Sequence, residues 1–173
     1  NYTAYEEIVE FSLGTFTNNS GPAFGAMYTD FTNMPTLTLT PGMTYPISIT
    51  SSFAPGFSGN YSCYVEVYIN WNQDSVFDEL SNELVFEGLT SSSNTISGNI
   101  SVPVGTLPGS PFLRVVFQET NSGANVHPCG TYTWGETEDY KVAVAAPQNM
   151  DAAAYKLLQP NLSLTLNEGD PLN

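Results

Sequence analysis

Apolar and polar residues alternate with a period of two along several stretches of the chain. The clearest stretch is 63–72, whose apolar positions are Cys63, Val65, Val67, Ile69 and Trp71. The first such stretch is 5–13, where Glu7 alone interrupts an otherwise apolar set formed with Tyr5, Val9, Phe11 and Leu13. Similar alternation recurs within 45–50, 96–102, 113–117 and 140–144. This pattern is typical of β-strands that bury one face, and clusters of Gly, Pro, Ser and Asn separate the stretches as turns would.

No long stretch has the periodicity of a helix, so the pattern predicts an all-β fold. We expect an antiparallel β-sandwich, immunoglobulin- or jelly-roll-like, with about seven to nine strands. The sandwich should occupy residues 1–146, and residues 147–173 should form a linker and a final strand around Leu162, Leu164 and Leu166. A single strand is not stable alone in water. The last strand would therefore join this sheet, begin a following domain or pair with a neighbouring subunit.

The charge balance narrows the range of functions. The chain has 17 acidic and 3 basic residues, for a formal charge of −14. Such a surface repels phosphate backbones, which excludes nucleic acid as a partner, and the apolar runs are too short for direct membrane insertion. The chain begins at Asn1, and we expect it to be a processed or trimmed product of a secreted or cell-surface protein.

The two cysteines, Cys63 and Cys129, are compatible with one disulfide formed in an oxidising, extracellular compartment. We predict that disulfide, and the alternative is a pair of buried free thiols.

Oxygen-bearing side chains recur at the end of the clearest strand, in the segment 70–83. Calcium takes six to eight oxygens, which a short turn can supply from carboxylates, Asn carbonyls and backbone carbonyls. We predict a Ca²⁺ site there, with ligands from Asn70, Asn72, Asp74, Val76, Asp78 and Glu83. The alternative is an Asn- and Asp-rich turn held by its own side chains without a metal.

A second acidic segment enters the strand predicted near the end of the sandwich. Three carboxylates, Glu136, Glu138 and Asp139, lie within four residues, a costly arrangement unless they are solvated, hydrogen-bonded or shared with a cation. We add Glu136 and Glu138 to the predicted calcium ligands. The alternative is an exposed acidic strand entrance.

The ordered set of motifs over residues 5–145 resembles the GEVED domain. The matching motifs are Tyr5-Glu6-Glu7-Ile8, Asn18-Asn19-Ser20, Tyr28-Thr29-Asp30-Phe31, Leu37 to Tyr45, Ile69 to Phe77, Leu113-Arg114-Val115, Pro128-Cys129-Gly130 and Gly135 to Tyr140. The resemblance implies a non-catalytic β-sandwich module of large secreted proteins, chiefly of Bacteroidota and marine bacteria, with a calcium-binding acidic loop. This chain departs from the family pattern within that loop. Asn70 stands for the usual first Asp, Ser75 for the Gly and Val76 for a frequent Asp.

Few other residues offer chemistry. His127 is the one histidine, and we expect it to be a loop residue near Cys129 and not half of a catalytic pair. Zinc and glycosidase sites would need ligands or carboxylates in other arrangements. We place Trp71 in the core, Trp134 in an exposed loop where it could stack on a sugar, and Arg114 in a salt bridge to a carboxylate such as Asp139.

Together these observations predict a chain that is not an enzyme. We expect a structural or adhesive module of a secreted or cell-surface bacterial protein, stabilised by calcium, or a subunit of an extracellular filament. Its partners would be other domains or subunits of the same protein. The alternative is a carbohydrate-binding accessory module of a secreted hydrolase, with glycans as partners.

Overall fold

Eleven β-strands and one short 3₁₀-helix form the part of the chain that the computed structural model describes, which comprises residues 6–21, 26–35, 37–53, 61–78, 82–90 and 94–146. The number of strands exceeds the predicted seven to nine because four of them are only two or three residues long: β2 (Phe16–Asn18), β3 (Tyr28–Asp30), β4 (Thr38–Leu39) and β11 (Ala143–Val144). The strand and linker predicted within 147–173 lie outside the described residues.

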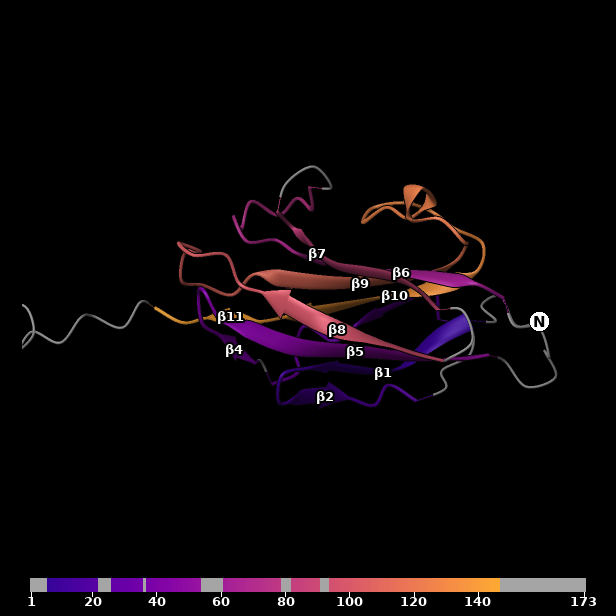
Figure 1. The fold of residues 1–173 in the computed structure, drawn as a ribbon, viewed down its shortest axis with the longest axis horizontal. Coiled ribbons are helices and arrows are strands. Elements are labelled where there is room, and N and C mark those ends of the chain that lie inside the picture. Colours follow the sequence, from indigo (N-terminus) through magenta and orange to yellow (C-terminus); the bar gives the residue numbers. More distant parts are fainter. Residues whose placement is uncertain are drawn as a thin grey trace, which may run out of the picture.

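Two sheets face one another (Figure 1). The four-stranded sheet has the order β2-β1-β5-β8, from β2 (Phe16–Asn18), β1 (Glu6–Leu13), β5 (Thr44–Phe53) and β8 (Thr95–Ser101). The five-stranded sheet has the order β3-β10-β9-β6-β7, from β3 (Tyr28–Asp30), β10 (Gly135–Lys141), β9 (Phe112–Glu119), β6 (Cys63–Ile69) and β7 (Leu84–Thr90). A small ladder joins β4 (Thr38–Leu39) to β11 (Ala143–Val144). The all-β sandwich predicted from the sequence is confirmed.

Most strand pairs are antiparallel, but two are parallel. These are β3 with β10, and β4 with β11. The first matters for the site, because it places Tyr28 beside Thr137 and Asp30 beside Asp139 at the edge of the five-stranded sheet.

The main core lies between the two sheets and has the composition that the alternation predicts. Cys63, Val65, Val67 and Ile69 are completely buried, and Trp71 is nearly so. They pack in one cluster with apolar residues of β1, β5, β8 and β9. The predicted core position of Trp71 is confirmed.

The alternation fails in β1, where a β-bulge shifts the register. Ile8 pairs with Ser51 and Glu10 with Thr50, so that Val9 has no position of its own in the ladder. As a result Ile8 and Phe11 are both buried, while Val9 is only half-buried. The prediction that Val9 shares the face of Phe11 is wrong, because the extra residue reverses the direction of every side chain before it.

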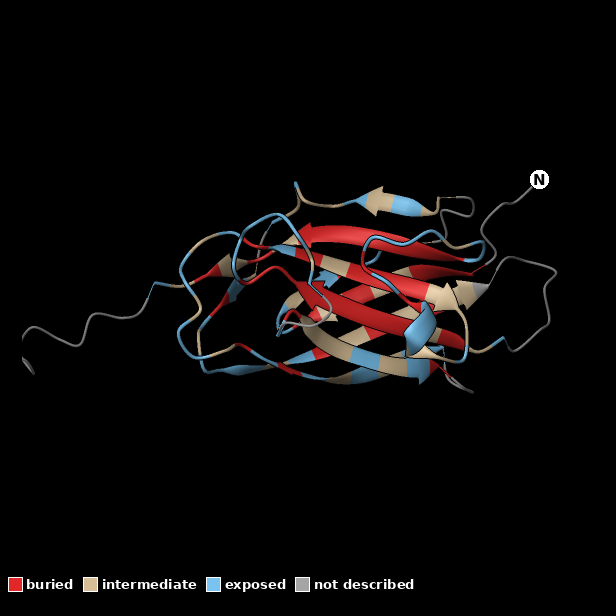
Figure 2. Ribbon diagram, turned by 90° about the horizontal axis from the view of Figure 1, so that it is seen from above, coloured by how far each residue is buried: buried red, intermediate tan, exposed pale blue. Residues whose placement is uncertain are grey.

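The outer face of the five-stranded sheet is also partly covered, which a pattern of one buried face does not predict. The connection between β9 and β10 carries the 3₁₀-helix Gly123–Asn125 and folds back over this face (Figure 2). Val126 packs there on Tyr68 and Val116 in a second, smaller cluster. Glu66 is buried on this face and accepts a hydrogen bond from the Tyr68 hydroxyl.

Candidate functional site

An arginine–carboxylate pair lies at the centre of the outer face. Arg114 of β9 stands directly opposite Asp139 of β10. Its Nε donates to Oδ1 at 2.7 Å and its Nη2 to Oδ2 at 2.6 Å, which is a bidentate pair of the strongest kind. The predicted salt bridge between these residues is confirmed.

Three further segments meet at this pair. Arg114 Nη1 donates to the carbonyl oxygen of Pro128 at 2.7 Å, and the guanidinium lies 5.0 Å from the centre of the Phe77 ring. The Tyr28 hydroxyl donates to Asp139 Oδ2 at 2.9 Å. The hydrogen bond to Asp139 raises the pKa of Arg114, and burial followed by that same carboxylate raises the pKa of Tyr28. We call these five residues, Tyr28, Phe77, Arg114, Pro128 and Asp139, the Arg114 cluster.

Glu136 points the other way and links the two sheets. Its Oε2 accepts a hydrogen bond from the backbone N–H of Ile8 in β1 at 2.9 Å, and its Oε1 accepts one from the Thr29 hydroxyl at 2.9 Å. Burial raises the pKa of this carboxyl. The N–H of Ile8 lies next to the bulge in β1, so Glu136 satisfies a backbone donor at the point where the ladder is irregular.

Glu138 is completely buried. Its Oε2 accepts a hydrogen bond from the Tyr140 hydroxyl at 2.7 Å, and the amide of Asn18 donates to that hydroxyl at 3.0 Å. Its Oε1 has no hydrogen-bond partner among the described residues. Burial raises the pKa of Glu138 to about 7, so near neutral pH this carboxyl titrates inside the sandwich.

The acidic motif that supplies these groups lies within a segment with a known counterpart. Residues 64–143, from β6 to the start of β11, match the family model of the GEVED domain. The match to this family covers slightly less than half of the chain. The family resemblance predicted from the sequence motifs is thereby confirmed for this segment, and it suggests a module of the kind found in extracellular proteins.

The other comparisons concern the fold. A crystal structure of the CARDB domain of a Pyrococcus furiosus protein, in complex with di-metal ions, is 10% identical, with a TM-score of 0.40 over 84% of this chain and 94% of that one. A solution structure of the same domain is 11% identical, with a TM-score of 0.36 over 82% and 97%. A LPMO from Kitasatospora papulosa is 13% identical, with a TM-score of 0.36 over 68% of this chain and 55% of that one. No curated protein matched the chain in sequence. The described residues include no helix of the length and apolar character needed to span a membrane.

The calcium ligands predicted from the sequence lie in two separate places in the structure, one in the segment 70–83 and the other in β10. Glu138 and Val67 both pair with Val115 of β9, so they lie level on either side of it, and Asn70 follows three residues beyond Val67. Glu138 and Asn70 are therefore two strand spacings apart across the sheet and three residues apart along it, which corresponds to about 14 Å. Glu136 and Glu138 therefore do not belong to a site in the segment 70–83. Their oxygens lie between the sheets instead.

The loop that contains the other candidate calcium ligands is held by hydrogen bonds to its own side chains. Asn72 Oδ1 accepts from the N–H of Asp74 at 3.0 Å, and Asp74 Oδ1 accepts from the N–H of Val76 at 2.8 Å. Gln73 and Ser75 have φ angles of 59° and 71°, in the left-handed region that glycine favours. These bonds agree with the metal-free turn that the sequence left as an alternative.

One observation in the same loop nevertheless fits a cation. Asn70 is 2% exposed, and its Oδ1 has no hydrogen-bond partner among the described residues. Glu83 is also buried, and its Oε2 accepts from the N–H of Asp78 at 2.9 Å. No three acidic, histidine or cysteine side chains within the described ranges lie close enough together to hold a metal ion by themselves. A cation here would depend on amide and backbone oxygens as well as carboxylates.

The predicted disulfide between Cys63 and Cys129 is wrong for this structure, in which both cysteines are free. Cys63 is buried between the sheets opposite Glu119, whereas Cys129 is exposed, with its Sγ 3.8 Å from Nη1 of Arg114. Glu119 and Arg114 are five residues apart on β9, which corresponds to about 17 Å of strand, and a disulfide joins Cα atoms about 4.4–6.8 Å apart. Burial raises the pKa of Cys63 to about 12, so its thiol stays protonated.

The other residues singled out from the sequence, His127 and Trp134, both lie in the connection between β9 and β10. His127 is exposed and borders a depression on each side of the segment 127–130. Trp134 precedes β10 and is 37% exposed, but it does not line the depression that contains Tyr28 and Tyr132.

Sequence reasoning gave no contact role to several residues that the structure places at these sites, notably Asn18 beside Tyr140, Phe77 beside Arg114 and Tyr132 in the depression. A usable signal existed for Glu136 and Glu138, because Tyr140 of the same strand was expected to face the core and period-two alternation places all three on one face. The partners in distant loops left no such signal, since their contacts depend on how the loops fold back.

Proposed function

We propose that this chain is a non-catalytic structural or adhesive module of a secreted or cell-surface protein. The observation that carries the proposal is the use of its acidic motif. Each carboxylate of Glu136, Glu138 and Asp139 bonds to the protein's own groups, and two of them connect β10 to other strands. The acidic motif of β10 therefore supports a role in stabilising the fold through hydrogen bonds within the protein.

A hydrolytic role for the same carboxylates is disfavoured by their burial. Glu136 is 3% exposed and Glu138 is 0% exposed. A general acid or nucleophile must come within hydrogen-bond distance of the substrate, and these side chains lie between two packed sheets.

Turnover assays test this proposal directly. The purified chain, assayed against peptide, ester and glycoside substrates, should give no turnover above that of the buffer. Turnover that disappears in folded Asp74→Asn or Glu138→Gln variants would overturn the proposal.

We also propose that the segment 70–83 binds Ca²⁺ weakly. Asn70 Oδ1 is the supporting observation, since a buried oxygen without a partner is costly unless a cation or water satisfies it. Asn72, Asp74, Asp78, Glu83 and the backbone carbonyl of Val76 are the other candidate ligands. Because the usual first carboxylate is an amide here, we expect an affinity in the roughly millimolar range of extracellular calcium modules.

Thermal unfolding with calcium or with chelator tests this second proposal. At about 10 mM Ca²⁺ and a Kd of about 1 mM, binding should stabilise the fold by roughly 1.4 kcal/mol, or a few degrees in Tm. The Asn70→Asp variant should show a larger calcium shift than the wild-type chain, because it restores a carboxylate. Identical melting in calcium and in chelator for both chains would contradict the site.

The proposed partners are other domains or subunits of the same surface protein, including neighbours in an extracellular filament. Light scattering on the chain alone and on a longer piece of the parent protein separates these cases. A chain that stays monomeric at all concentrations, alone and in the longer protein, would argue against the filament.

A further inference from the structure

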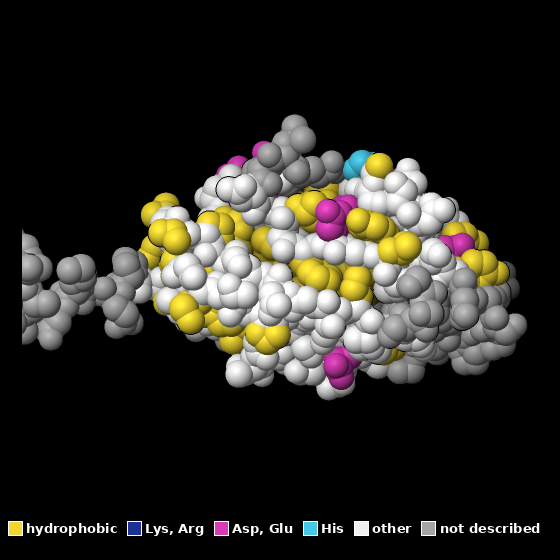
Figure 3. Space-filling view, in the orientation of Figure 1, with side chains coloured by type: hydrophobic (Ala, Val, Ile, Leu, Met, Phe, Trp, Pro, Cys, Tyr) yellow, Lys and Arg dark blue, Asp and Glu magenta, His cyan; other side chains and the backbone are white. Residues whose placement is uncertain are grey.

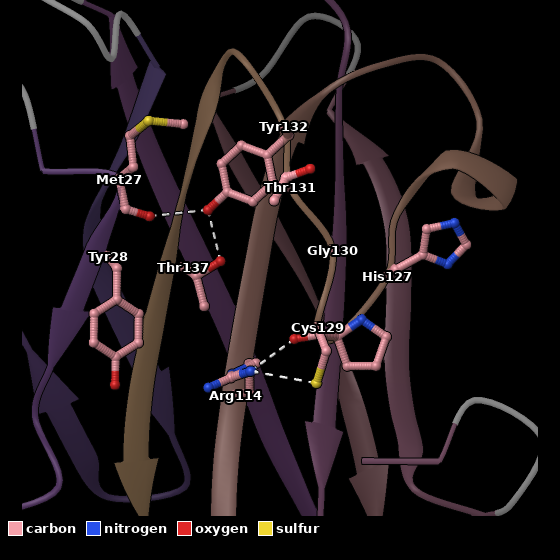
Figure 4. A pocket seen from close by; sticks show the side chains of 10 residues that line it. Met27, Tyr28, Arg114, His127, Cys129, Gly130, Thr131, Tyr132 and Thr137 are labelled. Atoms are coloured by element: carbon pink, nitrogen blue, oxygen red, sulfur yellow. Dashed lines mark hydrogen bonds between the residues drawn. The ribbon is translucent and has the colours of Figure 1, made fainter. Parts of the chain in front are cut away.

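A trough crosses the outer face at the Arg114 cluster, and Tyr28, Arg114 and Pro128 of that cluster line it. It has a volume of about 540 Å³. Figure 4 shows its floor, formed by Thr137 of β10 and Arg114 of β9, between Tyr28 on one side and the segment 129–132 on the other. The trough is therefore large enough for one ring-sized group with its substituents.

The aromatic side chains of the trough are held in place by hydrogen bonds from their polar ends. Tyr28 is 53% exposed, yet its hydroxyl is tied to Asp139. The Tyr132 hydroxyl donates to the carbonyl oxygen of Met27 at 2.9 Å and lies 2.6 Å from the hydroxyl oxygen of Thr137. Ring faces that are fixed before binding lose little conformational entropy when a ligand packs on them.

The charges around the trough favour a neutral ligand. Arg114 would attract an anion, but Asp139 already engages its Nε and Nη2, and Pro128 engages its Nη1. The chain as a whole carries a formal charge of −14, which repels anions at longer range. The side of the molecule drawn in Figure 3, a neighbouring side seen edge-on to the two sheets, shows acidic side chains and no basic side chain of the described residues.

We propose that this trough binds a neutral sugar residue, such as a hexose or N-acetylhexosamine at the end of a glycan. A pyranose ring has apolar C–H faces that pack on the exposed Tyr28 ring, and hydroxyl groups that reach the Thr131 hydroxyl at the rim. The site differs from the exposed Trp134 that the sequence favours. The site shares Tyr28 with the Arg114 cluster, where the hydroxyl donates to Asp139 and the ring is left for the ligand.

Ligand-observed and protein-observed NMR with simple glycosides tests the proposal. The probes are the methyl glycosides of glucose, galactose, mannose and N-acetylglucosamine, titrated to about 50 mM because a ligand of about a dozen heavy atoms binds in the millimolar range. At least one should shift the resonances of Tyr28, Thr131 or Thr137. Tyr28→Ala should weaken its binding by about tenfold or more, whereas Tyr28→Phe, which keeps the ring, should retain most of it.

Trp134→Ala is the matched control, since it removes an exposed aromatic ring from outside the trough. It should bind the glycoside as the wild-type chain does. If Tyr28→Ala proves unfolded by its NMR spectrum, Thr131→Trp replaces it, because it fills the trough from the exposed rim and leaves every residue of the Arg114 cluster unchanged in sequence. Three results would each overturn the proposal: no shift with any of the four glycosides, loss of binding in Trp134→Ala but not in the trough variants, or tighter binding of methyl glucuronide than of the neutral probes.

Discussion

Alternate side chains of β10 point to opposite faces of the sheet, and this explains how three acidic residues can share a short strand. Glu136 and Glu138 enter the space between the sheets, where they accept hydrogen bonds from Ile8, Thr29 and Tyr140. Asp139 points outward to Arg114. Neighbouring carboxylates thus meet different hydrogen-bond partners on opposite faces of the sheet.

The bidentate pair should be the most sensitive of these contacts to substitution. Asp139→Asn leaves the half-buried guanidinium of Arg114 without its counter-charge and leaves one acceptor oxygen for the three donor groups that the carboxylate's two oxygens accept from. Breaking a buried pair from one side usually costs about 3–5 kcal/mol, and partial exposure lowers the expected loss here to about 2–4 kcal/mol. Urea unfolding monitored by tryptophan fluorescence measures it.

Asp30→Asn is the control for this prediction. Asp30 lies beside Asp139 on β3 but is exposed, and its carboxylate accepts the N–H of Thr32, two residues along the chain. We expect a loss below about 1 kcal/mol. Equal losses in the two variants would mean that the Arg114 cluster does not stabilise the fold.

The buried carboxyl of Glu138 should make stability depend on pH. Burial raises its pKa from 4.5 to about 7 in the folded state, so the folded chain binds the proton more tightly than the unfolded chain does. This stabilisation is complete below pH 4.5 and is lost as the pH rises toward 7. Glu138→Gln mimics the protonated form, and its stability relative to wild type should therefore rise over that window by about 1.4 kcal/mol per pKa unit.

Unfolding free energies of both chains at several pH values between about 4 and 8 check the slope. Glu87→Gln removes one carboxylate from an exposed position of β7 and is measured alongside as the control for the loss of a charge. A Glu138→Gln difference that is flat across the window would rule out titration of this carboxyl inside the fold.

At the scale of elements, the pairing of β9 with β10 depends on the first residue of the acidic strand. Gly135 has a φ of 133°, and a Cβ at this position would collide with the carbonyl oxygen of Phe117 in β9. Gly135→Ala should therefore cost more than about 3 kcal/mol, by forcing the two strands apart. Gly105→Ala offers the comparison, because Gly105 also has a positive φ of 90° but no atom lies within 4 Å of the added Cβ.

The Gly105 variant should lose only about 1 kcal/mol, the ordinary cost of a left-handed alanine. Chemical denaturation measures the free energy of unfolding of both variants. The difference between their losses gives the cost of the contact with β9, apart from the cost of backbone strain. Similar losses in both would show that the contact between Gly135 and β9 has no special role.

The strands themselves were largely predictable, because alternation reports burial on one face. It worked for β6, where Cys63 to Ile69 form a regular ladder with β9. It failed in β1, where the bulge at Val9 reverses the phase, and on the outer face, where a distant loop covers Glu66 and Tyr68. The salt bridge of Arg114 was predictable from complementary charge. The position of Cys129 was not, because nothing in a loop's composition fixes where it folds back.

For the whole molecule, the dominant property is an excess of negative charge. The formal charge of −14 destabilises the compact state by self-repulsion, which salt screens. Raising NaCl from about 20 mM to about 500 mM should therefore raise Tm by a few degrees. Asp139→Asn should show a gain of similar size, since the partly buried Arg114 pair is screened much less than exposed charges are.

Thermal unfolding at the two salt concentrations, in the presence of chelator so that calcium does not contribute, gives this comparison. A Tm that falls with added salt would mean that exposed ion pairs outweigh the repulsion.

The placement of Arg114 also determines how a protease meets this molecule. Trypsin-like enzymes cut after Lys or Arg, and the chain has three such residues, Arg114, Lys141 and Lys156. Arg114 lies within β9, between β10 and β6, and Lys141 closes β10. Cleavage after Arg114 requires that its strand leave the sheet. Arg114, which bonds to Asp139 of β10 and to Pro128, is therefore accessible to the protease only when these contacts break. The rate of cleavage after Arg114 measures how often β9 separates from the sheet.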